Sequence, residues 1–185
     1  MIDLSKVSAC LISKDPIYPK QVLDHLMQFP FGEIIILTNS PNSAAKEELF
    51  RKAKYDHIYY QDDDAICPVN DVVAQAEPDI ITCAMKTLHI NNYGKSRIAL
   101  IGWGSIIPKK AIDEMVKYTD VFGTGDLYKR EYDRILTFLN FPQKRLDLPI
   151  YDLPSAFTQD RYSLQPEHYT NIPKIEGMCL TLLNK

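Results

Sequence analysis

The chain is poor in the residue patterns that mark several common classes of site. Its four cysteines are scattered without a CxxC spacing, which argues against a zinc site and against a disulfide framework. Its seven glycines form neither a GxGxxG nor a GxxxxGK[ST] motif, so a dinucleotide-binding fingerprint and a P-loop are both missing. No apolar run is long enough to span a bilayer, and Met1–Lys6 lacks the charged-then-apolar order of a signal peptide. We therefore expect a cytoplasmic protein with buried, reduced cysteines.

The composition is that of one ordinary globular domain. Hydrophobic residues make up 45% and charged residues 24% of 185 residues, enough for a sizeable core. The net charge of -3 is unevenly distributed, because residues 86–145 carry 11 Lys and Arg against 6 Asp and Glu, whereas residues 1–85 carry 7 against 13. The basic middle third is typical of solvated helix faces, and it also suits a surface that meets an anionic acceptor such as a nucleic acid.

Apolar runs alternate with segments of helical periodicity along the first half of the chain. Short, strongly apolar runs indicate buried strands at residues 6–12, 33–38, 57–60 and 78–84. Between them, apolar residues at helical spacing predict helices at residues 20–29, 44–54 and 69–76. This alternation predicts a single α/β domain with a Rossmann-type, mostly parallel sheet and helices on both faces.

The second half has a less regular pattern. A strand is expected at residues 97–101, directly before Gly102–Ser105, and helices are expected at residues 109–118 and 126–139. After Pro142 the periodicity fades, and recurring prolines predict an extended tail that wraps over the domain.

Three consecutive aspartates, Asp62–Asp64, follow the strand expected at residues 57–60. Adjacent carboxylates repel each other, so a fold tolerates them either in a solvated turn or around a cation. Ligands of α/β sheets bind at the carboxyl ends of strands, where this run lies. Asp62 and Asp64 would point the same way along an extended backbone, and two hard oxygen ligands suit Mg²⁺ or Mn²⁺ carrying a diphosphate. A solvated acidic turn is the plain alternative.

The order and spacing of these features resemble a small GT-A glycosyltransferase of the nucleotide-diphospho-sugar transferase superfamily. The resemblance covers most of the chain and is strongest over residues 7–130. Members of this family place an aspartate-any-aspartate motif at the end of a strand with a proline a few residues on, as Asp62–Asp64 and Pro68 do here. A glycine-containing acceptor loop, similar to Gly102–Ser105, and an acidic residue at the start of a helix, similar to Asp126, then follow.

The resemblance implies a division of the domain into two halves. Residues 1–85 would bind a nucleotide-sugar donor, with a UDP-sugar favoured, and residues 86–185 would form the acceptor half and the C-terminal tail. Ser13, Lys14 and Asn39 stand where the family holds the base and ribose. Many members have an aspartate in place of Asn39, which leaves the identity of the base open.

The resemblance also implies Mn²⁺ or Mg²⁺ as cofactor. Asp64 would bind the ion directly, and Asp62 would contact the ribose, the ion or both. Asp63 would contact hydroxyls of the donor sugar or be solvated. His168 stands where many members have a histidine that joins the metal shell. Such an ion stabilises the leaving nucleoside diphosphate as a Lewis acid.

The acceptor side of an inverting transferase needs a general base for the acceptor hydroxyl. Asp126 is the candidate and Asp120 the second choice, although Asp126 would also serve as an ordinary N-cap of the helix at residues 126–139. Trp103, the single tryptophan, and Gly104 are the candidates for acceptor contact, because a flat aromatic face beside glycines can stack on a sugar or base. Core packing of Trp103 is the alternative.

The predicted function is therefore metal-dependent transfer of a sugar, of the hexosyltransferase type, from a nucleotide-diphosphate sugar to an acceptor hydroxyl. The acceptor stays open among a glycan, a small molecule, a protein and a hydroxymethylated DNA base, as do the stereochemistry and the oligomeric state. A sugar nucleotidyltransferase is one alternative, but its usual glycine-rich loop after the first strand is missing from residues 13–18. A non-catalytic nucleotide-sugar-binding domain is the other alternative, and the intact acidic cluster disfavours it.

Overall fold

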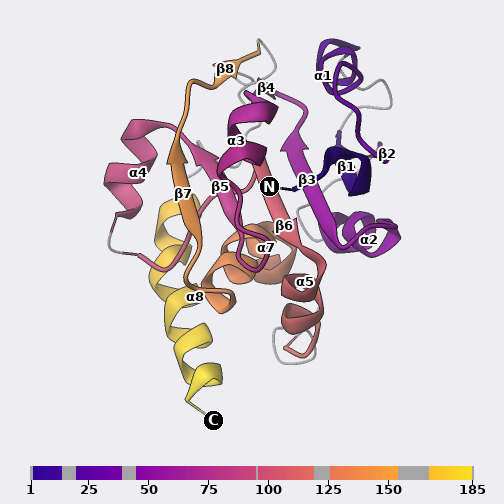
Figure 1. The fold of residues 1–185 in the computed structure, drawn as a ribbon. Coiled ribbons are helices and arrows are strands. Elements are labelled where there is room, and N and C mark those ends of the chain that lie inside the picture. The colour runs from indigo at the N-terminus through magenta and orange to yellow at the C-terminus, as the bar shows by residue number, and fades with distance from the viewer. Residues whose placement is uncertain are drawn as a thin grey trace.

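The computed structural model describes residues 2–13, 20–38, 45–94, 96–118, 126–153 and 167–184, without the side chains of residues 92, 126, 127, 129 and 167–169. A six-stranded sheet of order β2-β1-β3-β6-β5-β7 forms the centre of this part of the chain (Figure 1). Its strands are β1 (Val7–Ile12), β2 (Glu33–Leu37), β3 (His57–Asp62), β5 (Thr82–Met85), β6 (Trp103–Pro108) and β7 (Lys144–Asp147). A separate pair consists of β4 (Ala65–Ile66) and β8 (Tyr151–Asp152).

The sheet is mostly parallel, as the alternation of strands and helices predicts. β1 pairs in parallel with β2 and β3, and β5 pairs in parallel with β7. β6 is antiparallel to both of its neighbours, β3 and β5. The carboxyl ends of the five other strands therefore lie along the same edge as the start of β6. In this register Ile12 stands opposite Leu37 on one side and Asp62 on the other.

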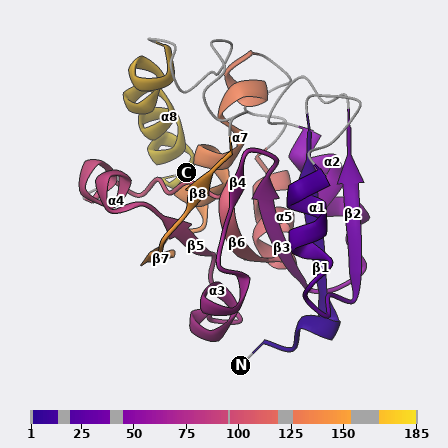
Figure 2. The same cartoon turned by 90° about the horizontal axis from the view of Figure 1, so that it is seen from above.

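Helices cover both faces of the sheet, and each face has its own apolar cluster (Figure 2). α2 (Ala45–Lys52), α5 (Lys109–Val116), α7 (Asp126–Leu139) and α8 (Glu167–Leu183) contribute to the first cluster. α1 (Lys20–Leu26) and α3 (Val69–Gln75) contribute to the second. Side chains of a strand alternate between the faces, so Tyr60 of β3 belongs to the first cluster and Tyr59 to the second. The next residue on the face of Tyr60 is Asp62.

The four cysteines are free and buried, as expected for small apolar side chains. None of the helices in the described residues combines the length and the apolar composition that a bilayer crossing needs.

The strand expected at residues 97–101 is wrong. Ile98, Ala99 and Ile101 are buried, as in a strand, but their backbone is irregular and the strand begins only at Trp103. Side chains from other elements satisfy this backbone. The hydroxyl of Thr137 on α7 accepts from the Ala99 N–H at 3.0 Å and donates to the Ala99 carbonyl at 3.1 Å. Because these groups are already bonded, no neighbouring strand is needed to satisfy them.

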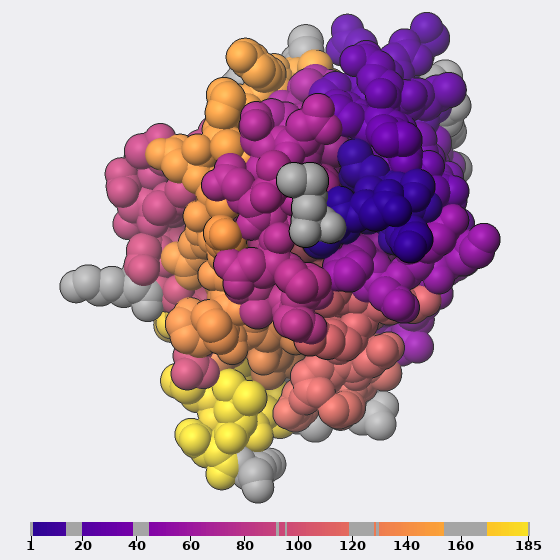
Figure 3. Space-filling view, viewed as in Figure 1, coloured from indigo at the N-terminus to yellow at the C-terminus, as the bar shows by residue number. Residues whose placement is uncertain are grey.

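The extended tail expected after Pro142 is also wrong in large part. The chain adds β7 to the sheet, forms β8, and ends in α8, which has 17 residues. Ile172, Ile175 and Cys179 recur at helical spacing and pack in or against the first apolar cluster, so α8 lies on α7 despite the proline at position 173. A short helix that the sequence pattern missed, α4 (Thr87–Tyr93), flanks the segment of β7 and β8 at the surface (Figure 3).

Candidate active site

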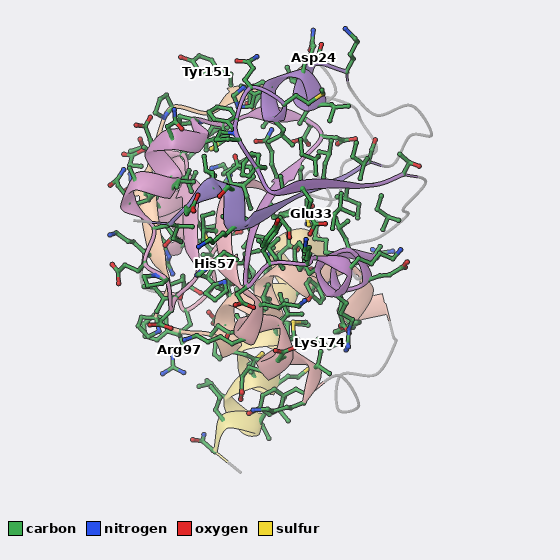
Figure 4. The ribbon with its side chains drawn as sticks, turned by 45° about the vertical axis from the view of Figure 1, so that its right-hand side comes forward. Asp24, Glu33, His57, Arg97, Tyr151 and Lys174 are labelled. Atoms are coloured by element: carbon green, nitrogen blue, oxygen red, sulfur yellow. The ribbon has the colours of Figure 1, made fainter. Side chains whose placement is uncertain are left out.

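Four candidate residues from different parts of the sequence meet at the carboxyl edge of the sheet. Ser13 follows β1, Asp62 ends β3, Asp63 follows it, and Trp103 begins the antiparallel β6. The Asp62 N–H donates to the Gly102 carbonyl at 2.7 Å, which joins the acidic run to the start of β6. Tyr151 of β8 lies toward this edge, whereas His57, the first residue of β3, lies farther from it (Figure 4).

The acidic run turns directly after Asp62. Asp63 and Asp64 form a tight turn into β4, so the extended backbone assumed for Asp62–Asp64 is wrong. The Asp63 carboxylate accepts from the Ser13 hydroxyl at 2.6 Å. The Asp64 carbonyl accepts from the Leu153 N–H at 2.7 Å, which ties the turn to the end of β8. The turn is therefore fixed on both sides by residues distant in sequence.

The Asp62 carboxylate is held by three neighbours and is 34% exposed. Its Oδ1 accepts from the Tyr60 hydroxyl and lies 3.5 Å from the Lys46 ammonium. Its Oδ2 lies against Gly102, where an added Cβ would come within 2.0 Å of that oxygen. Burial raises the pKa of Tyr60 well above its ordinary value, and the charge of Asp62 acts in the same direction, so the hydroxyl stays protonated and donates.

Lys46 is a functional candidate that the sequence analysis did not single out. Its side chain is only 6% exposed, on the face of α2 that also buries Leu49 and Phe50. The ammonium lies 2.6 Å from Asp133 Oδ2 on α7 and 4.9 Å from the centre of the Tyr60 ring. The spacing of Lys46, Leu49 and Phe50, three and four residues apart, is the signal that would have identified it.

The two carboxylates near Lys46 keep it charged. Burial alone would lower its pKa, but the charges of Asp133 and Asp62 outweigh burial and the pKa of Lys46 is raised. Burial raises the pKa of Asp133 above its ordinary value, against the effect of Lys46, and the charge of Asp62 adds to the rise. Two carboxylates thus share one ammonium in the interior, directly beneath the acidic run.

A second cluster lies toward β5, at the same edge. Lys86 follows β5, forms an ion pair with Asp152 of β8, and places its ammonium 5.1 Å from the centre of the Trp103 ring. His89 of α4 meets Trp103 edge-on, with ring centres 4.5 Å apart. Trp103 is half-buried, so one aromatic surface is covered by this cluster and part of the ring stays accessible.

The predicted acceptor residue Gly104 has a packing role. It has a φ of 98°, which favours glycine, and an added Cβ would lie 2.4 Å from the Cys67 sulfur and 2.8 Å from the Tyr59 hydroxyl oxygen. Gly104 is buried. Its lack of a side chain therefore serves the fold of β6 against its neighbours.

Several predicted site residues fall outside the described part of the chain. Lys14, Asn39 and Asp120 lie in segments that are not described. Asp126 is the first residue of α7 and His168 the second residue of α8, but their side chains are not described. The roles assigned to these five residues remain predictions.

The acidic run Asp62–Asp64 is the candidate cation site at this edge. Within the described residues, no group of three or more His, Cys, Asp or Glu side chains is placed to hold a metal. Mg²⁺, however, is usually held by one or two carboxylates together with waters and substrate phosphates. The carboxylates of Asp62–Asp64 supply hard oxygens of that kind at the end of β3.

Comparison with known proteins identifies the fold. No family model and no curated protein matches the chain. The catalytic domain of Drosophila β1,4-galactosyltransferase 7, solved in complex with xylobiose, superposes with a TM-score of 0.56, at 10% identity, over 91% of this chain and 79% of that one. A197 from STIV superposes with a TM-score of 0.51, at 15% identity, over 80% of this chain and 85% of that one.

The fold is GT-A-like. At 10% and 15% identity these likenesses establish the architecture alone. They confirm the predicted fold class, and the chemistry has to be argued from the residues at the carboxyl edge.

Proposed function

We propose that this chain is a glycosyltransferase that moves a sugar from a nucleotide-diphosphate sugar to an acceptor hydroxyl. One observation carries the proposal: the acidic run Asp62–Asp64 lies at the carboxyl end of the central strand β3 in a GT-A-like sheet. Ligands of open α/β sheets bind at this edge. The Ser13 hydroxyl, the end of β3 and the start of β6 at Trp103 converge on the same place.

The donor side of the proposed site is built on β1 and β3. The bonded pair Ser13–Asp63 presents polar oxygens next to Asp62, which suits hydroxyls of a ribose or a sugar. We assign Mn²⁺ or Mg²⁺ to Asp64 and Asp62, with His168 as a further ligand. The ion, when bound, would offset the charge that develops on the leaving diphosphate. A UDP-sugar as donor, and a hexosyl group as the sugar, are part of the proposal.

The acceptor side is proposed to lie toward β6 and α7. Asp126 would accept the proton of the acceptor hydroxyl as its oxygen bonds to the anomeric carbon and the bond to the diphosphate breaks. Trp103 offers a half-buried aromatic face for stacking beside the donor. The acceptor itself is a hydroxyl compound, with a glycan and a hydroxymethylated DNA base as the two classes to try first.

The test is hydrolysis of a panel of nucleotide sugars with Mn²⁺. Asp64→Asn removes one charge facing the ion and should lower hydrolysis of the best donor by about a hundredfold or more, because such an ion contributes several kcal/mol. Asp79→Asn is the matched control, since Asp79 is an exposed aspartate that pairs with Lys110 before β5 begins. Undiminished hydrolysis by Asp64→Asn in EDTA would refute the proposed metal-assisted transfer.

A further inference from the structure

The buried ammonium of Lys46 has an unusual setting for a lysine. Taking an ammonium out of water costs several kcal/mol before any pairing. Here the ammonium contacts the Asp133 carboxylate at 2.6 Å, the Asp62 carboxylate at 3.5 Å and the face of Tyr60. A pair of apolar residues would fill the same space with similar or greater stability. The retained charge therefore points to a task at Asp62.

The Asp62 carboxylate is the group on which the Lys46 ammonium acts. Tyr60 and Lys46 both act on Oδ1, while Gly102 closes against Oδ2. These neighbours come from β3, α2 and the segment before β6, so the carboxylate is restrained from three directions. Without Lys46, Oδ1 would keep its bond to the Tyr60 hydroxyl, and Gly102 would still limit Oδ2. The contact from α2 would be lost, so rotation about the Cβ–Cγ bond would be less restricted.

Asp133 holds the lysine in turn. The Lys46 side chain is long and flexible, and its shortest contact, 2.6 Å to Asp133, holds the ammonium beside Asp62. Lys46 is the second residue of α2, which follows the segment that contains Asn39, and Asp133 belongs to α7, which begins at Asp126. The contacts Asp133–Lys46–Asp62 thus join α7 and α2 to the end of β3.

We infer that Lys46 is a positioning residue that fixes the Asp62 carboxylate for the donor, and that Asp133 holds Lys46 in place. This inference rests on the proposed function, because it assigns Asp62 to the donor site. Lys46 itself contacts no ligand in this arrangement. Its effect on binding passes through the orientation and charge of Asp62.

The experiment separates positioning from stability with a double variant. Lys46→Met keeps most of the apolar stem but leaves the largely buried Asp133 without its cation, so this variant should unfold at a lower temperature. In Lys46→Met/Asp133→Asn both buried charges are gone, and the unfolding temperature should return toward that of the wild type. Lys52→Met is the matched control, because Lys52 lies on the same helix in an exposed pair with Glu48.

The first readout is calorimetric titration with UDP in the presence of Mn²⁺. The double variant should bind UDP at least about tenfold more weakly than the wild type, since a charge-assisted contact to Asp62 is lost. Lys52→Met should bind as the wild type does. Wild-type UDP affinity in a stably folded double variant would overturn the inference and leave Lys46 as a structural residue. If the double variant does not fold, Asp133→Asn alone takes its place and should weaken UDP binding several-fold.

The second readout needs no ligand. In crystal structures, the Asp62 carboxylate should be rotated about its Cβ–Cγ bond in the double variant relative to the wild type, or should occupy more than one orientation. An unchanged Asp62 would overturn the inference. A wild-type protein that binds neither UDP nor a nucleotide sugar with Mn²⁺ would instead refute the proposed function, and the crystal structures would still decide the role of Lys46.

Discussion

Two lysine–aspartate pairs lie near the carboxyl edge of the sheet, and they differ in how far water reaches them. Lys46 and its partner Asp133 have side chains that are 6% and 18% exposed, whereas those of Lys86 and Asp152 are 28% and 27% exposed. Both lysines also contact an aromatic ring, Tyr60 in the first case and Trp103 in the second. The same chemistry thus gives a mostly buried ion pair beneath the proposed donor side and a more exposed one beside the proposed acceptor side.

This difference has a physical cause. In the interior an ion pair is attracted strongly but must offset the loss of hydration, so breaking one partner leaves an uncompensated charge. Near the surface water and salt screen the pair, and its members can separate at little cost. This arrangement suits the proposed transferase site, in which Asp62 beside Lys46 would be held in place and Trp103 beside Lys86 could adjust to an acceptor.

The largest expected effect is loss of the buried cation. Lys46→Met should lower the free energy of unfolding by about 3 to 5 kcal/mol, because Asp133 is left buried and unpaired. Lys86→Met removes the same side chain from the exposed pair and should cost about 1 kcal/mol or less. Urea unfolding of both variants measures the difference. Equal losses would show that burial does not distinguish the two pairs.

A smaller effect is expected from steric pressure on Asp62. Gly102→Ala places a methyl group within 2.0 Å of Asp62 Oδ2, which forces the carboxylate away from Tyr60 and Lys46. We expect a loss of about 1 to 3 kcal/mol in the free energy of unfolding. Gly177→Ala in α8 is the control, because no other part of the described structure lies within 4 Å of its added Cβ, and it should stabilise by about 0.5 to 1 kcal/mol. If Gly102→Ala is as stable as the wild type, Gly102 does not restrain Asp62.

The smallest expected effect is on the pH dependence of stability, through His89, which lies near the exposed pair Lys86–Asp152. Burial lowers the pKa of His89 below its ordinary value of 6.5, and Lys86 acts in the same direction against Asp152. The unfolded chain therefore binds this proton at a higher pH than the folded chain does. The contribution of the neutral His89 ring to the free energy of unfolding is fully present above pH 6.5, and it is lost as the pH falls from 6.5 through the lower pKa of the folded state. Among the described residues, the buried Nδ1 of His89 has no hydrogen-bond partner, which fits a neutral ring.

His89→Gln should remove this part of the pH dependence. Urea midpoints at about pH 7.5 and about pH 5.5 should differ less in the variant than in the wild type. If the urea midpoint of His89→Gln falls between these pH values as much as that of the wild type, a group other than His89 causes the pH dependence.

The sequence predicts the first half of the fold well because its strands are buried on both faces and separated by helices with clear periodicity. It also places Asp62 at the end of a strand. It fails at residues 97–101, where apolar residues form no ladder because side chains such as Thr137 bond their backbone. It misses α8 because the proline at position 173 conceals the helical spacing of Ile175 and Cys179.

The site was harder to predict than the fold, because its residues meet through contacts between segments that are distant in the sequence. Ser13 and Asp63 were assigned separately, and only the parallel pairing of β1 with β3 brings them into contact. Lys46 was not among the predicted site residues, because its contacts with Asp62 and Asp133 join segments that are far apart in the sequence. Interactions between distant segments decide such roles, and local periodicity does not record them.

The most direct test of the account is thermal unfolding with a UDP-sugar in the presence and absence of Mn²⁺. If the carboxyl edge holds a donor through Asp62–Asp64 and an ion, the sugar nucleotide should raise the unfolding temperature with Mn²⁺ and not with EDTA. Asp64→Asn should abolish the rise. An equal rise in EDTA, or an undiminished rise in Asp64→Asn, would contradict the claim that this edge binds the donor through a cation.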